Sequence, residues 1–332
     1  MSEIGEGDHA RSQERTWATI KAHAEQTGGP GFGLIADKLR AGASPSTSLL
    51  GTPVIIDTDI GGDPDDAIAL ICAAVAIPEL ALVVTSDEHD GGRARFARYL
   101  LDLLGRSDVP VVAGAQLSAT RYWVVADLVP DDTPAQPRNV VVAVSKVCAG
   151  GGPVRWVGMG PLTNLAYVIT ENPQLADQLA ITQTGGAINY RDPARASHNF
   201  RLDPDAAITV VNDATRLQLV ISDVTTNEAV AIRPGDDFYL RLTTPQAPPW
   251  AAVLRQHLDH WFDTFHPFSH QHDPLTLSAA LRLPFVTFTR QRRFRIEADA
   301  RMFLDPAGHT AWIATRADYP AFLTWLGKQL TW

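Results

Sequence analysis

A dense group of carboxylates follows the first strongly apolar segment of the chain, in the stretch PVIIDTDIGGDPDDAIAL at 53–70. Its five aspartates are Asp57, Asp59, Asp63, Asp65 and Asp66. Carboxylates this close repel one another, so their pKa values rise unless positive charge offsets the repulsion. The N-terminus of a helix contributes only about 0.3–1 kcal/mol per charge. Because all the candidate ligands are oxygen atoms, the loop predicts a site for a hard divalent cation, calcium or magnesium.

Two known kinds of acidic loop can be compared with this one. In an EF-hand, Asp57 and Asp59 would be the first and third loop positions, but the twelfth is Ile68 in place of glutamate, and a strand-like segment precedes the loop. The EF-hand is therefore excluded. A magnesium-dependent phosphatase of the haloacid dehalogenase type also begins with Asp-x-Asp after a strand. Asp57 would then be the nucleophile and Asp59 the general acid, and these residues alone leave that alternative open.

The composition limits the classes of protein that need consideration. The 332 residues are 45% hydrophobic and 20% charged, enough for a large core in one α/β domain or two smaller domains. The formal net charge of -9 argues against a nucleic-acid partner, because such proteins are usually basic.

The cysteines and the chain's apolar segments indicate a cytoplasmic protein. Cys72 and Cys148 have no CxxC spacing, which is typical of buried thiols in a reducing compartment. The first 15 residues are polar and do not resemble a secretory signal. The sequence contains no apolar run of 18 residues, so no membrane partner is expected.

The elements that must position the acidic loop alternate between strands and helices. Strands are expected at 54–56, 81–84, 109–112, 140–144, 154–157, 180–183 and 217–221, and helices at 67–76, 93–104 and 162–169. This alternation predicts an α/β fold with an open, mostly parallel central sheet and helices on both faces. Ligands of such sheets bind beyond the carboxyl ends of the strands, which is where Asp57 and Asp59 lie.

The first 50 residues differ from the rest. Short helices are expected around 15–25 and 34–40, separated by Gly- and Pro-rich residues, and ASPSTS at 43–48 is typical of a linker. The sequence therefore predicts an N-terminal extension over 1–50 and a catalytic domain over 51–332.

Three later stretches, together with the acidic loop, resemble the inosine-uridine preferring nucleoside hydrolase family. They are RWVGMGPLTNLAYVI at 155–169, HNFRLDPDAA at 198–207 and SHQHDPLTLSAA at 269–280. Their order and spacing agree with the family over about residues 53–280, while the first 50 residues fall outside the resemblance. A zinc site built from the nearby histidines at 266, 270 and 272 is disfavoured, because their spacing does not match a helical i, i+4 pair.

The resemblance implies a calcium ion at the bottom of the pocket. Its ligands would be Asp59, Asp66, the backbone carbonyl of Thr163, and Asp273, with possible support from Asp57 and Asp63. A water molecule and two sugar hydroxyls would complete the six to eight oxygen ligands that calcium usually takes.

The implied reaction is hydrolysis of the N-glycosidic bond of a nucleoside, releasing free base and sugar. Asp59 would act as general base on a water molecule acidified by the metal, and His272 would protonate the leaving base. Asp65 and Asn199 would bind the ribose hydroxyls. Members of this family are commonly oligomers, so the resemblance also implies a homodimer or homotetramer.

Several positions depart from the family pattern on the side of the sugar. Asp87 stands where the family has Asn, and Ser197 stands where it has a Glu that helps hold the ribose hydroxyls. Asn189, in TGGAINYRDP at 184–193, is expected near the 5′ hydroxyl. These changes predict a modified nucleoside or a differently substituted sugar. The recognised motifs place no basic residue to hold a phosphate, which argues against nucleotides.

The side of the pocket that would hold the base is less defined by the sequence. Two segments supply aromatic residues that could stack on a base: Tyr122, Trp123, Trp261 and Phe262. A non-enzymatic alternative also stays open, in which the departures at Asp87 and Ser197 leave a nucleoside-like ligand bound without turnover.

Overall fold

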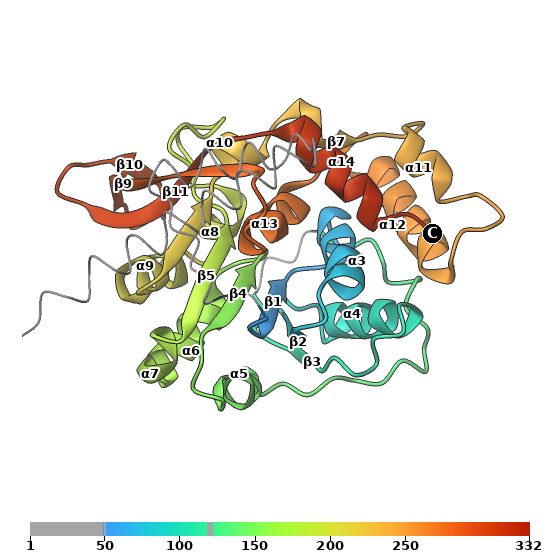
Figure 1. Ribbon diagram of the computed structural model, residues 1–332, viewed down its shortest axis with the longest axis horizontal. Helices are drawn as coiled ribbons and strands as arrows, with labels where there is room; N and C mark the ends of the chain where they lie inside the picture. Colours follow the sequence, from blue (N-terminus) through green and yellow to red (C-terminus); the bar gives the residue numbers. More distant parts are fainter. Residues whose placement is uncertain (1–48, 50, 118–121) are drawn as a thin grey trace, which may run out of the picture. The chain divides into compact units, whose positions relative to one another are not determined.

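The computed structural model describes residues 49, 51–117 and 122–332 (Figure 1). The predicted helices at 15–25 and 34–40 lie outside the described residues, as does nearly all of the predicted extension. Within the described residues, no helix combines the length and the apolar character that crossing a membrane would require.

A nine-stranded sheet forms the centre of the described chain (Figure 1). Its strand order is β10-β9-β11-β6-β5-β4-β1-β2-β3. The strands are β1 (Val54–Thr58), β2 (Leu80–Thr85), β3 (Val111–Ala113), β4 (Val154–Gly158), β5 (Leu179–Thr184), β6 (Leu217–Val220), β9 (Val286–Ile296), β10 (Met302–Leu304) and β11 (His309–Ala317). Every pair from β11 to β3 is parallel, whereas β9 is antiparallel to both β10 and β11. The predicted open, mostly parallel sheet is confirmed. A separate pair is formed by β7 (Ala231–Ile232) and β8 (Ser269–His270).

Helices cover both faces of this sheet. They are α3 (Asp65–Ala76), α4 (Gly92–Leu103), α5 (Val140–Cys148), α6 (Thr163–Glu171), α7 (Pro173–Ala176), α8 (His198–Leu202), α9 (Pro204–Asp213), α10 (Ser222–Thr225), η2 (Glu228–Val230), α11 (Asp237–Arg241), α12 (Pro249–Thr264), α13 (His272–Ala280) and α14 (Tyr319–Gln329). One group packs as α5 on α6 and α6 on α9, and another joins α3, α13 and α14. Figure 1 shows these groups on opposite faces.

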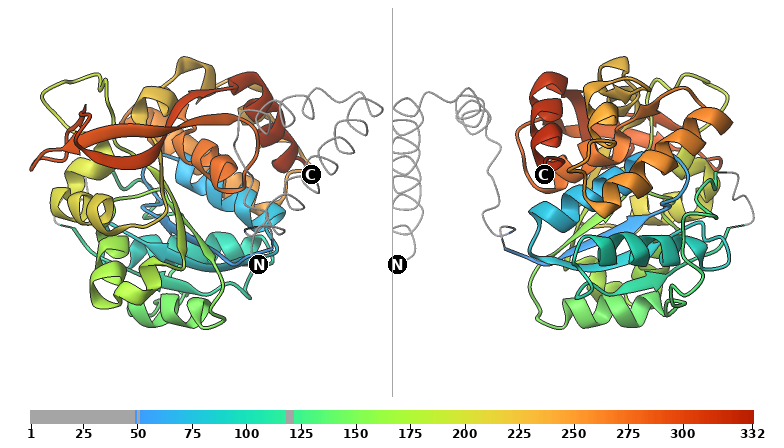
Figure 2. Two further views of the ribbon diagram at one scale, coloured as in Figure 1. Left: turned by 60° about the vertical axis from the view of Figure 1, so that its left-hand side comes forward. Right: turned by 90° about the vertical axis from the view of Figure 1, so that its right-hand side faces the viewer.

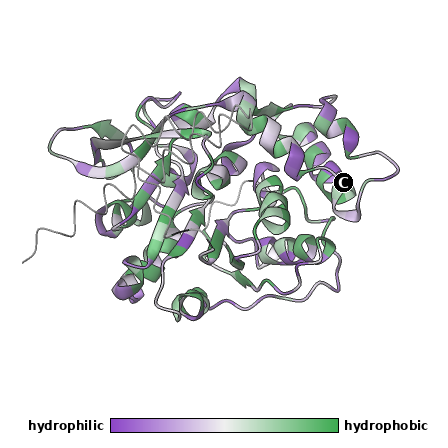
Figure 3. Cartoon of the chain, in the orientation of Figure 1, coloured by the Kyte–Doolittle hydropathy of each residue, from purple (hydrophilic) through white to green (hydrophobic). Residues whose placement is uncertain are grey.

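The central strands are apolar because both of their faces are covered. All five residues of β1 and of β4 are buried, and Figure 3 shows hydrophobic residues concentrated in these strands and in α3. Parallel strands buried on both faces are usually near-continuous apolar runs. The short run predicted at 54–56 therefore became a strand as expected.

The strand predicted at 140–144 is wrong, because these residues lie in α5. The Asn139 side chain caps this helix by accepting a hydrogen bond from the backbone N–H of Val142 at 3.0 Å. Val140, Val144 and Cys148 are the buried residues, and their spacing of four matches one face of a helix. A run of β-branched residues suggested a strand, but packing of one helical face decided the outcome.

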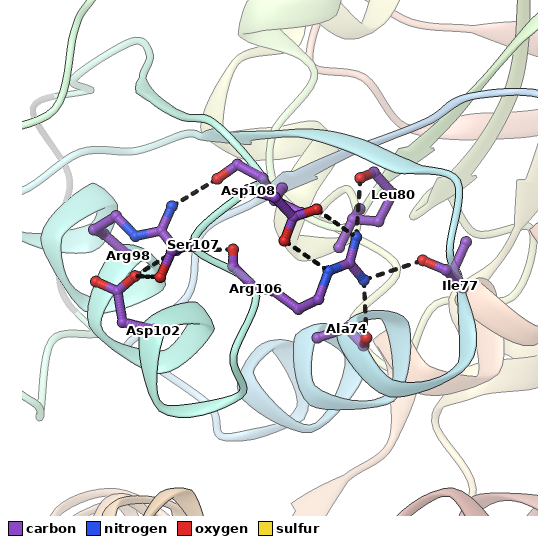
Figure 4. Close-up of polar contacts among 9 residues, drawn as sticks. Ala74, Ile77, Leu80, Arg98, Asp102, Arg106, Ser107 and Asp108 are labelled. Atoms are coloured by element: carbon purple, nitrogen blue, oxygen red, sulfur yellow. Dashed lines mark hydrogen bonds and ion pairs between the residues drawn. The ribbon is translucent and has the colours of Figure 1, made fainter.

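The end of α3 remote from the acidic loop is held by Arg106 (Figure 4). Its guanidinium donates to the backbone carbonyls of Ala74 at 2.9 Å and Ile77 at 3.2 Å, which are among the carbonyls that a helix leaves without internal partners. It also contacts the Leu80 carbonyl, at the start of β2, at 3.4 Å. These bonds fix α3 relative to β2.

The register of the parallel strands brings several loops to one edge. Thr58 of β1 is opposite Thr85 of β2, while Gly158 of β4 is opposite Asp57 and Gln183. The loops after β1, β2, β4 and β5 therefore leave the sheet side by side. The loops are so close that a Cβ at Gly160 would collide with Ser86 Oγ, so a larger residue there would have to displace its neighbour.

Candidate functional site

Three buried carboxylates from two helices meet at this edge of the sheet. Oxygen atoms of Asp65, Asp66 and Asp273 lie within 4.8 Å of one another. Asp65 and Asp66 begin α3, and Asp273 is in the first turn of α13. These two helices pack side by side, as Figures 1 and 2 show. Residues separated by more than 200 positions thus form one acidic cluster, which we call the aspartate cluster.

Hydrogen bonds hold each carboxylate of the aspartate cluster. Asp65 Oδ2 accepts from the backbone N–H groups of His272 at 3.1 Å and Asp273 at 3.3 Å. Asp66 Oδ1 accepts from the Thr58 hydroxyl, and Asp273 Oδ1 lies 3.0 Å from Thr184 Oγ1. The donors come from β1, β5 and the N-terminus of α13, so the sheet and the helices together fix the oxygen positions.

The electrostatics of the aspartate cluster favour a bound cation. Burial, followed by repulsion from Asp65, raises the pKa of Asp66 to about 7. Burial and neighbouring carboxylates also raise the pKa values of Asp65 and Asp273 well above the usual range. A divalent cation would offset this cost, and three carboxylates at this separation fit a hard cation with oxygen ligands.

The other aspartates of the loop surround the cluster. The Asp59 side chain is half-buried. This burial, followed by repulsion from Asp66, raises the pKa of Asp59. Asp57 Oδ1 accepts from the Asn164 amide at 2.9 Å, and burial raises the pKa of Asp57 to about 7. Asp63 accepts from the Ser269 hydroxyl, and burial raises its pKa to about 8. Asp57 and Asp63 therefore each have a partner outside the cluster.

Thr163 and Asn164 begin α6, and neither side chain caps it. The Thr163 hydroxyl donates to Asp203 Oδ2 at 2.6 Å, so its side chain has a partner outside the aspartate cluster. Its carbonyl as a metal ligand remains a prediction. The Asn164 amide also donates to the Thr85 carbonyl at 3.0 Å and accepts from the Ala115 N–H at 2.9 Å. Asn164 therefore connects the ends of β1 and β2 to the loop after β3. The sequence analysis gave Asn164 no role at the site, although it stands in the recognised GPLTN segment.

Arg93 is a buried cation beneath the acidic loop that the sequence analysis also missed. It is 1% exposed. Its guanidinium donates to the backbone carbonyls of Asp59, Ile60 at 2.9 Å, Tyr122 at 3.0 Å and Asp87 at 2.7 Å. Its charge lowers the pKa values of Asp59 and Asp66, against the larger effect of burial. The only signal in the sequence was its place directly after a second acidic segment, SDEHDGG at 86–92.

Asp87 is buried and lies 3.6 Å from the Arg93 guanidinium, Oδ2 to Nη2. Its φ is +46°, in the left-handed region that Asn and Asp tolerate better than most residues. The family's Asn and the Asp of this chain therefore suit the same backbone position. The neighbouring Glu88 accepts from the backbone N–H groups of Arg93 and Ala94 at the start of α4, which makes it a helix-capping residue.

Three of the predicted sugar-binding residues lie after β5. Asn199 is buried, and its amide donates to the backbone carbonyls of Met159 and Thr184, so it borders the aspartate cluster through Thr184. Ser197 Oγ accepts from the Gly186 N–H at 2.8 Å. Asn189 is exposed, and its Nδ2 donates to Asp223 at 3.0 Å. Ser197 and Asn189 are thus partly engaged in holding their own loop.

His272 lies beside the aspartate cluster with an uncharged ring. Burial, followed by the positive potential of nearby groups, lowers its pKa to about 3. Its ring centroid is 5.6 Å from that of His270. Among the described residues, the histidines considered for zinc form no metal-binding group; the aspartate cluster is the group found.

The predicted aromatic residues divide into different environments. The Tyr122 ring lies 5.6 Å from Trp261 and 5.5 Å from His198, centroid to centroid, and the Cβ and backbone of Tyr122 lie against Gly62 of the acidic loop. Trp123 stacks on His89 at 5.2 Å. Tyr122 and Trp123 therefore border the site. Phe262 contacts the Tyr239 ring in a different group.

Comparisons with known proteins agree with this geometry. The family model described as inosine-uridine preferring nucleoside hydrolase matches residues 54–324. The pyrimidine-specific ribonucleoside hydrolase RihA of Escherichia coli O81 is 29% identical over 274 residues, covering 76% of this chain and 86% of that protein. RihA of Photobacterium profundum is 32% identical over 251 residues, covering 69% and 79% respectively.

Solved structures of nucleoside hydrolases share the fold. A plant nucleoside hydrolase superposes with a TM-score of 0.70 at 22% identity, covering 84% of this chain and 99% of that one. An inosine-uridine preferring nucleoside hydrolase from Bacillus anthracis gives 0.69 at 15%, with the same coverage. The phosphatase and the non-enzymatic alternatives are not favoured by these matches. The chain belongs to the inosine-uridine preferring nucleoside hydrolase family, whose members are N-glycosyl hydrolases.

Proposed function

We propose that this nucleoside hydrolase depends on calcium and uses Asp59 as its general base. The observation that carries the proposal is the aspartate cluster, in which Asp65, Asp66 and Asp273 bring three buried carboxylates within 4.8 Å. Without a cation this arrangement is costly, since a buried charge needs a partner. Calcium is preferred because it takes six to eight oxygen ligands and tolerates irregular geometry.

Asp66 and Asp273 would hold the ion, as the resemblance implies, and their position in the aspartate cluster supports this. Asp65 is a third oxygen donor of the same cluster, so we extend the ligand set to it. Asp59 and the Thr163 carbonyl complete the proposed set. When bound, calcium supplies positive charge that acidifies the attacking water and orients the sugar hydroxyls.

Asp59 would take a proton from the water as the water oxygen bonds to C1′ of the sugar. The bond from C1′ to the base nitrogen breaks, and its electron pair leaves with the base, which then takes up a proton. Burial and Asp66 raise the pKa of Asp59, so the ionised group is a stronger proton acceptor than an ordinary aspartate. The nearby carboxylates favour the positive charge that develops on the sugar.

For His272 we propose a part in this reaction that differs from the proton donor expected from the sequence. A ring with a pKa of about 3 carries no extra proton at neutral pH. We therefore assign His272 to hydrogen bonding of the substrate in its neutral form. Asn199, fixed by two backbone carbonyls, and Asp65 remain the proposed ribose contacts.

The test is release of free base and sugar from a panel of nucleosides, measured by chromatography. Pyrimidine ribonucleosides come first, because the similar RihA proteins are named pyrimidine-specific. Each reaction is run with chelator, with calcium restored, and with magnesium in its place. Asp59→Asn is compared with Asp205→Asn, which removes the same charge from an exposed position on α9.

Product formed only with calcium, lost in Asp59→Asn and retained in Asp205→Asn, would support the proposal. Full activity in chelator would refute calcium dependence, and full activity of Asp59→Asn would refute the assignment of the base. We also propose a homo-oligomer, from the family resemblance, and a cytoplasmic location, from the cysteines and the apolar segments. Light scattering on the purified protein tests the number of subunits.

A further inference from the structure

A cavity of about 300 Å³ lies between the loop after β5 and the β9–β10 hairpin, and two of the predicted sugar-binding residues, Asn189 and Ser197, line it. One wall is the loop after β5, with Asn189, Tyr190, Arg195 and Ser197, and the other is the β9–β10 hairpin with Arg301. The volume is many times what a single water molecule needs. The lining combines cationic and amide side chains with aromatic and aliphatic ones, among them Ile188, Met302 and Phe303.

This cavity is linked to the aspartate cluster indirectly, through a short chain of residues. Ser197, on its wall, immediately precedes α8, which carries Asn199. The Asn199 amide donates to the Thr184 carbonyl at 3.2 Å, and Thr184 Oγ1 lies 3.0 Å from Asp273 Oδ1. A sugar bound at the cluster and contacted by Asn199 would therefore have the cavity at its side.

Ser197 and Asn189 indicate which side of the sugar faces the cavity. Both line it, and the family resemblance implies that both lie near the sugar hydroxyls, with Asn189 on the 5′ side. The family's Glu at the Ser197 position would place a longer, negatively charged side chain at the cavity. Serine leaves room and removes the negative charge.

The charged side chains that line the cavity, Arg195 and Arg301, are both positive, while the Asp223 carboxylate accepts from the backbone N–H groups of Ile188 and Asn189 in its wall. Arg195 is exposed and forms no ion pair with any described residue. Arg301 forms an ion pair with Asp299 at 2.6 Å and donates a hydrogen bond to the Pro193 carbonyl at 3.3 Å. After burial, the charges of four arginines, including Arg191 and Arg195, contribute to lowering the pKa of neighbouring His198. The same positive potential would attract an anion.

We propose that this cavity binds a phosphate group on the 5′ carbon of the sugar, with Arg195 and Arg301 as the contacts, so that the enzyme acts on nucleoside 5′-monophosphates. This inference rests on the proposed function and names the substrate class of the same site. The motifs alone argued against nucleotides, but Arg195 and Arg301 are more than 100 positions apart and meet only in the fold. Arginine is well suited to phosphate, because its planar fork can donate two parallel hydrogen bonds.

The test compares kcat/KM for a nucleoside and its 5′-monophosphate across a panel of bases, with calcium present. Variants are Arg195→Gln, Arg301→Gln, both together, and Ser197→Glu. The matched control is Arg293→Gln, which removes a positive charge from the same hairpin, where Arg293 is exposed and donates to the Pro306 carbonyl. In parallel, calorimetry measures binding of ribose 5-phosphate, ribose and inorganic phosphate.

We expect the wild-type enzyme to prefer the monophosphate. Loss of a charged hydrogen-bonding partner should lower the ratio of kcat/KM for monophosphate to that for nucleoside on the order of tenfold in each single Arg variant, and further in the double variant and in Ser197→Glu. Arg293→Gln should keep the wild-type ratio. A wild-type preference for the free nucleoside, or equal ratios in all variants, would overturn the inference.

Calorimetry separates this inference from the proposed function. If no compound is hydrolysed, the proposed function fails, yet binding of ribose 5-phosphate that is lost in the double Arg variant and retained in Arg293→Gln would still support the phosphate site. Absence of ribose 5-phosphate binding to the wild-type protein would refute the phosphate site even if nucleosides are hydrolysed.

Discussion

The Asp65 carboxylate accepts a hydrogen bond from the backbone N–H of Asp273, Oδ2 to N at 3.3 Å. This contact joins the N-terminus of α3 to that of α13 and sets the separation of two carboxylates in the aspartate cluster. The partial positive charge at both helix termini favours the ionised carboxylates, but by much less than a divalent cation would. The geometry of the proposed metal site therefore depends on how α3 and α13 pack.

Asp273→Asn should weaken calcium binding on the order of 100-fold, because it removes one of three clustered charges while nearly preserving volume. Isothermal calorimetry on protein freed of metal measures the change. Asp205→Asn on the surface of α9 is the control and should bind calcium like wild type. Equal affinities for Asp273→Asn and the control would place the ion elsewhere.

Arg93→Met should lower the free energy of unfolding by about 3–5 kcal/mol, because it removes the cation 3.6 Å from buried Asp87 and the donors to four backbone carbonyls, two of them in buried hydrogen bonds. Urea denaturation measures the loss. Asp87→Asn in the same chain should restore part of it by removing the buried charge. Arg95→Met on the same helix, whose guanidinium donates to partly buried or exposed carbonyls, should cost less. An equal cost for both arginine variants would contradict this role of Arg93.

With metal removed by chelator, the protein should lose stability as the pH rises from 6.5 to 8.5. Burial raises the pKa values of Asp57 and Asp66 to about 7 and of Asp63 to about 8. The folded state thus binds protons that the unfolded state, with pKa 3.8, has already released, and stability falls by up to about 1.4 kcal/mol per group and pH unit. The buried histidines, with lowered pKa values, are neutral in the folded state. In the unfolded state they lose their remaining protons just above pH 6.5, which opposes the trend by less than about 0.5 kcal/mol for each histidine.

Thermal unfolding across this range, with chelator and with calcium, measures that dependence. Calcium should raise the midpoint more at pH 8.5 than at 6.5, since it replaces protons on the carboxylates. An apo protein that becomes more stable between pH 6.5 and 8.5 would show that these aspartates are ionised without a cation.

His272→Gln should lower kcat by less than about tenfold and leave the shape of the pH profile unchanged, because a ring with a pKa of about 3 donates no proton at neutral pH. The pH dependence of kcat and KM for one nucleoside, in wild type and variant, provides the measurement. A loss above about 100-fold together with loss of the alkaline limb would identify His272 as the acid.

The sequence by itself determined the mostly parallel sheet, the acidic loop at the end of its first strand, and the family. Short apolar strands, helical spacing and the Asp-rich motif are local signals, because each depends on residues close in the chain. Even so, the segment at 140–144 was misread, since a run of valines suits a strand and a helix face equally, and only packing against α6 and the sheet distinguished them.

Only the tertiary structure decided which carboxylates come together and what surrounds them. Asp65 entered the aspartate cluster because α13 packs on α3, and Arg93 lies under the loop because α4 follows the neighbouring strand. Arg195 and Arg301 reach one cavity because the β9–β10 hairpin lies against the loop after β5. Such contacts join distant segments, so the spacing of residues in the sequence cannot reveal them.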